Sequence, residues 1–309
     1  MTQLNRINYY NIGAMLASAC LAVLIPFELV LLSYAILGPA HYLTEISWLK
    51  GKQFFTPKKY DYLIIVAILI AGLVSKIPYA NVLFYTFGFS LVLLFIKSNV
   101  NRVLGAIILI IAGYFLLGHN IPRTIFGLYM PTLIHVYIFT GAFLLLGALK
   151  SKNVSGYMAF FTFLICPLLL STLFITWHNE PTAWAISNYH PFIRLNTTTL
   201  RNQSINIYTN SASIILTRII AFAYTYHYLN WFSKTRIINW HRISVTRAII
   251  IGLIWAASVA LFFYNYRIGF KWLFMLSLLH VVLEFPLNHR SFISIGKELR
   301  SRFSPMSVK

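Results

Sequence analysis

The 309-residue sequence is poor in charge and very poor in acids. Charged residues make up 10% of the chain and only 6 residues are Asp or Glu, whereas 59% are hydrophobic. A soluble domain has about 25% charged residues. Because a soluble fold of this length cannot bury that much apolar surface, the composition predicts an integral membrane protein.

The sequence also lacks the common signatures of metal and disulfide chemistry. Its two cysteines, Cys20 and Cys166, both lie in apolar runs, which excludes a disulfide framework and a thiolate metal site. No two of the 9 histidines are two, three or four residues apart. This spacing excludes the histidine boxes of membrane desaturases and hydroxylases, and the HExxH motif of zinc proteases is absent too.

Basic residues are present in large excess. Lys and Arg number 25, for a formal net charge of +19. No basic helix interleaved with aromatics and no nucleic-acid recognition motif accompanies them, so we expect no nucleic-acid partner. They lie in short connections between apolar runs, where they are expected to meet the anionic lipids of the cytoplasmic face.

The apolar runs predict an all-α, polytopic helical bundle with about nine transmembrane helices, within a range of eight to ten. We treat residues 1–309 as a single transmembrane domain. The nine segments are 11–37, 61–76, 80–96, 103–118, 128–149, 156–177, 211–232, 244–264 and 268–288. The first contains Pro26, so it is either one kinked helix or two spans joined by a tight turn. We predict one helix, ended by Gly38-Pro39, because the residue before a proline avoids helical dihedrals.

Lys and Arg alternate in abundance between successive connections. The richer set is 50–60, 97–102, 150–155, 233–247 and the tail at 289–309. The positive-inside rule places this set in the cytoplasm. Nine spans then put the C-terminus in the cytoplasm and the N-terminus outside, with the polar loop at 178–210 as an external cap or lid. A bacterial inner membrane is the expected location.

Ionisable residues inside a bilayer are costly, so each is a functional candidate. His41 and Glu45 are four residues apart, and so are His280 and Glu284. On a helix this spacing puts both side chains on one face. Either pair would also be explained by a simple hydrogen bond, and His41 alone by an interfacial anchor.

Two more histidines lie in predicted spans. His227 falls at a depth similar to that of His280, whereas His135 lies nearer the outer half of its span and fits less well. We predict one metal held by His41, His227, His280 and His135, with the glutamates as ligands or as groups that orient the imidazoles. Iron is favoured, and manganese and zinc are alternatives.

One short motif resembles a known family. Gly38, Pro39, Ala40 and His41, followed by Glu45, are similar to the Gly-Pro-His-Gly motif and following acid of the bacterial membrane β-carotene dioxygenases. In this sequence Tyr42 replaces the second glycine. The resemblance implies many spans, isolated histidines on separate helices that hold one iron, and a lipophilic substrate.

The residues and the resemblance together predict a non-haem iron oxidoreductase or oxygenase that acts on an isoprenoid or acyl chain. Glu45, Glu284 and Tyr226 are the predicted catalytic residues. The predicted substrate pocket consists of Tyr224, Tyr228, Trp231 and Phe285. Three alternatives remain: a transporter with a His/Glu proton relay, a haem protein with histidine axial ligands, and a purely structural membrane protein.

Overall fold

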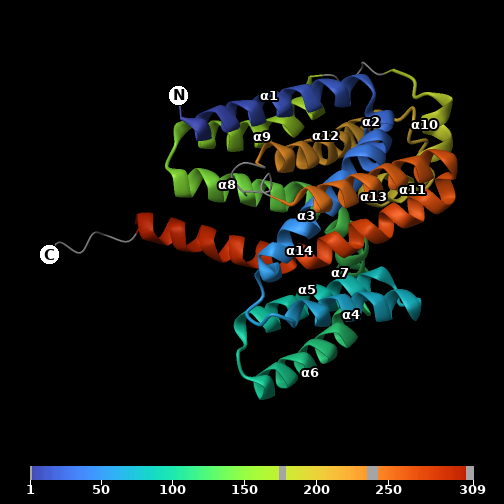
Figure 1. The fold of residues 1–309 in the computed structure, drawn as a ribbon. Coiled ribbons are helices and arrows are strands. Elements are labelled where there is room, and N and C mark those ends of the chain that lie inside the picture. The colour runs from blue at the N-terminus through green and yellow to red at the C-terminus, as the bar shows by residue number, and fades with distance from the viewer. Residues whose placement is uncertain (1, 174–178, 235–242, 304–309) are drawn as a thin grey trace.

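The structure is a computed structural model that describes residues 2–173, 179–234 and 243–303, and all its regular elements are helical. Figure 1 shows them as a bundle crossed by one long C-terminal helix. The elements are α1 (Gln3–Leu24), α2 (Pro26–Leu32), η1 (Ser33–Leu37), α3 (Gly38–Gly51), η2 (Gln53–Phe55), α4 (Asp61–Val74), α5 (Tyr79–Phe95), α6 (Asn99–Leu116), α7 (Asn120–Thr124), η3 (Ile125–Phe139), α8 (Thr140–Ser151), α9 (Val154–Thr172), α10 (Ala183–Asn188), α11 (His190–Thr199), α12 (Ser211–Ser233), α13 (Val245–Tyr264) and α14 (Tyr266–Phe303).

Seven helices of the described chain are long and apolar enough to cross a membrane. They are Gln3–Leu24, Pro26–Gly51, Asn99–Leu116, Asn120–Ser151, Val154–Thr172, Val245–Tyr264 and Tyr266–Arg302. The helices α4 and α5 are apolar but shorter. A multi-pass, all-helical membrane protein is therefore confirmed, whereas the number nine stays a prediction.

The first apolar stretch differs from its prediction. It forms two helices that meet at Ile25, where the backbone leaves helical dihedrals (φ −139°), and Pro26 begins the second. Proline suits a first helical turn, where its missing N–H has no partner to lose. The predicted end at Gly38-Pro39 is also wrong, because the helix continues there from η1 into α3. His41 therefore lies inside a long helix and not at its end.

Because the first apolar stretch forms two helices and not one, the predicted positions of the two termini change. Near the N-terminus, Asn8 Nδ2 donates to Ser155 Oγ (2.9 Å), in the first turn of α9. Near the C-terminus, Arg302 donates to the carbonyl of Leu149 and to Tyr157 Oη, both at 2.6 Å. The start of α1 and the end of α14 therefore lie at the same end of the bundle as the connection 151–153 (Figure 1). We call this the basic end, and the prediction of termini on opposite sides is wrong.

The polar loop at 178–210 folds in its described part into α10 and α11. The ring of Tyr189 packs on Phe27 of α2, with centroids 4.9 Å apart. The buried Asn196 amide donates to Ser213 and Thr217 of α12. This loop is thus a packed cap on the end of the bundle away from the basic end.

The helices α4, α5 and α6 form a group below α14 in Figure 1. Arg102 at the start of α6 makes a two-pronged ion pair with Asp61 of α4 (2.8 and 2.9 Å). His289 of α14 is buried against Ser90 of α5, with Nε2 2.7 Å from Oγ. The ion pair thus holds the group together, and the Ser90–His289 contact joins it to the long helix that carries His280.

The sidedness can be tested by labelling single cysteines. In a Cys20→Ala, Cys166→Ala background, exposed positions Thr2 and Lys297 are each changed to Cys. Because the termini share one end of the bundle, both should react with a membrane-impermeant maleimide only after the membrane is opened. A Gln203→Cys control in the cap should react in intact cells, and the same behaviour at residue 2 would contradict the arrangement.

Candidate metal centre

Four histidines from four different helices meet inside the bundle. They are His41 on α3, His135 on η3, His227 on α12 and His280 on α14. All four are buried, and each offers a ring nitrogen within 4.8 Å of those of the others. All four predicted metal ligands are therefore brought together, including His135.

The four rings stand around a common centre. The His41 ring lies 4.6 Å from His227 and 4.8 Å from His280, measured between centroids. The His135 ring lies 4.9 Å and 4.7 Å from the same two rings. His227 and His280 face each other across the centre at 6.5 Å.

Two of the histidines are presented by π-helical segments. The segment η1 ends four residues before His41, and η3 contains His135. Each segment has a nearby proline: Pro39 follows η1, and Pro131 lies within η3. A proline removes one N–H and crowds the carbonyl four residues earlier, and the wider π turn relieves this crowding. The π-helix is rare in proteins, and where it occurs it is frequently at a functional site.

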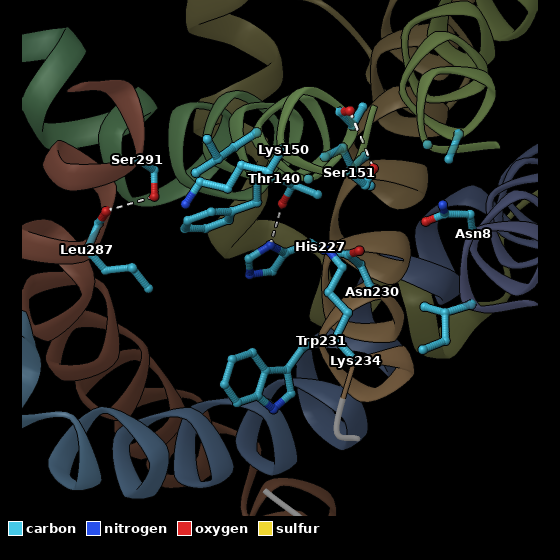
Figure 2. A pocket seen from close by; sticks show the side chains of 18 of the residues that line it. Asn8, Thr140, Lys150, Ser151, His227, Asn230, Trp231, Lys234, Leu287 and Ser291 are labelled. Carbon is cyan, nitrogen blue, oxygen red and sulfur yellow. Dashed lines mark hydrogen bonds between the residues drawn. The ribbon is translucent and has the colours of Figure 1, made fainter. Parts of the chain in front are cut away.

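The outer nitrogens of two rings are held by hydrogen bonds. His227 Nδ1 lies 2.7 Å from Thr140 Oγ1, the bond drawn in Figure 2. His280 Nδ1 lies 3.2 Å from the carbonyl oxygen of Ser277. In both rings Nε2 has no hydrogen-bond partner among the described residues. Metal-bound histidines typically show this pattern, with the outer nitrogen bonded and the inner one facing the ion.

Both predicted glutamates border the histidines. Glu45 Oε2 lies 3.1 Å from His41 Nε2 and 3.4 Å from His280 Nε2, and Glu284 Oε2 lies 3.2 Å from His135 Nδ1. These contacts have ion-pair distances without hydrogen-bond geometry. Glu45, His280 and Glu284 form a second group that has ligand atoms within 4.8 Å of one another. Asn288 donates to Glu284 Oε2 (3.3 Å), which fixes that carboxylate.

The chemistry of these atoms fits a metal ion. Both ring nitrogens of His41 and His135 are buried and lack hydrogen-bond partners in the described chain. Leaving a buried polar atom unsatisfied costs about 1–3 kcal/mol. A cation at the centre would satisfy several of these atoms at once and balance the adjacent carboxylates. The buried histidines and acids can therefore hold a metal ion.

The remaining predicted site residues divide into two sets. Trp231 lies near His41 (ring centroids 5.6 Å) and donates to Thr44, and Tyr228 lies 5.3 Å from His41. Tyr226 instead donates to Asn11 of α1 (3.0 Å). The predicted catalytic tyrosine is thus on another face of α12, because consecutive helical residues point about 100° apart.

The structure separates two predicted pocket residues from the histidines' cavity. Phe285 packs on Phe87 of α5, with centroids 5.1 Å apart, and Tyr224 packs on Tyr228 at 6.1 Å. Neither lines the cavity described below, and Tyr228 does not line it either, so Trp231 alone of the four predicted pocket residues does.

Sequence reasoning missed several residues that support the histidines. Tyr42 stacks on His280 (4.8 Å) and shares a hydrogen bond with Tyr228 (2.7 Å between hydroxyls). Thr140 carries no sequence signal, because one threonine in an apolar run is ordinary. Asn288 did carry one, since it lies four residues after Glu284.

A cavity of about 470 Å³ adjoins the histidines. His41, Glu45, His227 and Glu284 line its inner part. Figure 2 looks into it, with His227, Asn230 and Trp231 on one wall and Leu287 and Ser291 across from them. The volume is that of a small-molecule site.

Comparison with known proteins gives no relative: the chain matches no protein-family model, no curated protein and no solved structure.

Thr140→Val tests whether the histidines form a metal site. The change removes the oxygen that orients His227, so affinity for added Co²⁺, followed by its visible absorption, should fall by roughly 10- to 100-fold. Thr86→Val is the matched control, because Thr86 is buried but bonds only its own helix. Equal Co²⁺ affinity in the two variants would contradict the assignment.

Proposed function

We propose that the protein is a membrane-embedded, metal-dependent oxidoreductase that uses iron and O₂ to oxidise a lipophilic substrate. One observation carries this proposal: four buried imidazoles without a full set of hydrogen bonds converge beside two carboxylates and border a cavity. A structural role would need no such cavity at the ligands.

The donor set favours iron. Imidazole and carboxylate donors suit iron, manganese and zinc, and no cysteine of the described chain joins the group to favour a softer ion. Zinc with four protein ligands is typically a closed structural site, whereas catalytic zinc keeps three. An ion with a higher coordination number retains positions for small molecules beside four histidines. Iron accepts imidazole and carboxylate donors, takes a coordination number above four, and supplies redox chemistry.

The chain's own residues would position the reaction. Thr140 and Ser277 hold two imidazoles in place, and Asn288 holds Glu284. The apolar cavity wall excludes water and presents a hydrocarbon chain to the ligands. Bound iron would supply the activation of O₂. Cleavage of a carbon–carbon double bond by O₂ gives two carbonyl groups, a reaction that balances without a further reductant.

The similarity of Gly38-Pro39-Ala40-His41 to the β-carotene dioxygenase motif supports the same proposal. This short stretch leads directly from η1 to the first imidazole. An unsaturated isoprenoid or acyl chain is the proposed substrate. The proposed setting is a bacterial inner membrane, with the basic end toward anionic lipids of the cytoplasmic face.

The geometry disfavours the two main alternatives. A haem needs a flat slot between two axial ligands, whereas here four rings surround one point. A proton relay distributes its groups along a path across the membrane. In this protein the histidines and glutamates instead gather in one compact cluster.

Metal analysis and nitric oxide binding test the proposed function. Protein purified after iron-supplemented expression should hold close to one iron per chain. Ferrous protein treated with nitric oxide should give the EPR signal of a high-spin nitrosyl, because an open position remains beside the four histidines. His280→Gln should lose both, and His119→Ala, an exposed histidine, should keep both. Wild-type protein with less than about a tenth of an equivalent of any transition metal would contradict the proposal.

A further inference from the structure

Side chains of opposite charge line different parts of the cavity beside the histidines. At its inner part it is lined by the two acids of the site, Glu45 and Glu284. The cations in its lining are Lys150 and Lys234. Lys150 is the last residue but one of α8, and Lys234 follows α12, so both lie at the basic end of the bundle.

Helix geometry gives the separation of the backbone positions that carry the lining residues. Lys234 is seven residues beyond His227 along α12, or about 10 Å. Lys150 is ten residues beyond Thr140 along α8, or about 15 Å. The backbone positions of the two lysines therefore lie roughly 10–15 Å from those of His227 and Thr140.

The wall between the two parts is mainly apolar. It comes from α1, α8, α9 and α14 and includes Leu4, Ile7, Phe143, Leu144, Ala159 and Leu287. Such a surface suits a hydrocarbon chain. Near the lysines, Asn8, Asn230 and Ser151 add hydrogen-bonding groups. The lining thus changes from acidic to apolar to basic along the cavity.

We propose that the cavity binds a single-chain amphiphile by its anionic headgroup, a carboxylate or phosphate, which pairs with Lys150 and Lys234 while the apolar chain extends to the histidines. This inference rests on the proposed function and names the substrate class. The opposite orientation would leave both lysines without an anion and would put the apolar chain against the exposed Lys150. The reaction then falls on the apolar chain and not on the headgroup.

The state of Lys234 agrees with this assignment. Burial lowers the pKa of its amine to about 8, and the described residues give it no ion-pair partner. A headgroup anion would supply the missing partner and favour the protonated amine. Lys150, exposed at the mouth, is placed to receive the headgroup as it leaves the lipid surface.

Binding of three probes to the purified protein in zwitterionic nanodiscs tests the proposal. Laurate, dodecyl phosphate and dodecanol share one chain and differ in the headgroup. Trp48 and Trp231 line the cavity, so their fluorescence reports binding. We expect the better of the two anions to bind at least about tenfold more tightly than dodecanol. The ranking of laurate against dodecyl phosphate identifies the headgroup.

Charge removal at the lysines completes the test. Lys234→Met and Lys150→Met should each weaken anion binding by about tenfold and leave dodecanol binding unchanged, and Lys234→Arg should retain anion binding. Lys152→Met, an exposed lysine in the adjacent turn, is the control and should match the wild type. Equal binding of the alcohol and both anions, or equal anion binding by the wild type and both lysine variants, would overturn the proposal.

Metal content separates this proposal from the metal assignment. Iron per chain should be the same in the lysine variants and the wild type, which also shows that the variants fold. Anion selectivity without iron would contradict the proposed function and leave the amphiphile site standing. Iron binding without anion selectivity would contradict the amphiphile site and leave the proposed function standing.

Discussion

Imidazole nitrogens that are buried in a membrane protein and not hydrogen-bonded impose the main constraint on this structure. Water is absent from the hydrocarbon region, so each such atom needs a partner within the protein. His41, His135, His227 and His280 leave inner nitrogens unbonded and direct them toward one another. One cation would relieve this cost at all four rings. The hydrogen bonds from Thr140 and Ser277 hold two of the rings in the orientation that this cation would need.

The backbone is built to deliver these rings. Both π-helical segments adjoin a proline, and each presents a histidine to the centre. The other two histidines come from regular positions on α12 and α14, whose outer nitrogens are held by hydrogen bonds. The helices α1, α8, α9 and α14 line the adjoining cavity with apolar side chains, and Lys150 and Lys234 complete its lining. Metal ligands, substrate channel and basic mouth are therefore consequences of a single packing arrangement.

The sequence predicted the site better than it predicted the topology. The repeated HxxxE spacing identified His41, Glu45, His280 and Glu284 because a four-residue interval fixes a helix face in any context. His135 was harder to place, because depth counted along the chain ignores the π-helical segment and the crossing angle of its helix. Thr140 and Tyr42 act through contacts between distant segments, which no local pattern records.

The topological error came from one residue. A turn at Ile25–Pro26 that is tight enough to separate two helices resembles a kink in the sequence, and missing it reversed the side predicted for the N-terminus. The positive-inside rule depends on the parity of spans, so one missed helix changes the predicted side of every segment before it. The prediction of Tyr226 as catalytic failed for another reason: it is next to His227 in the sequence, but neighbouring residues on α12 face different helices, and Tyr226 contacts Asn11 of α1.

X-ray absorption at the iron edge of the purified protein measures the central claim directly. Four imidazoles around one ion predict about four nitrogen scatterers near 2.1 Å, with the outer-shell scattering of histidine rings. Replacing His135 by alanine should reduce the histidine contribution by about a quarter, because each ring contributes equally. An iron spectrum without histidine scattering, or one that is unchanged in His135→Ala, would show that the four rings do not hold the metal.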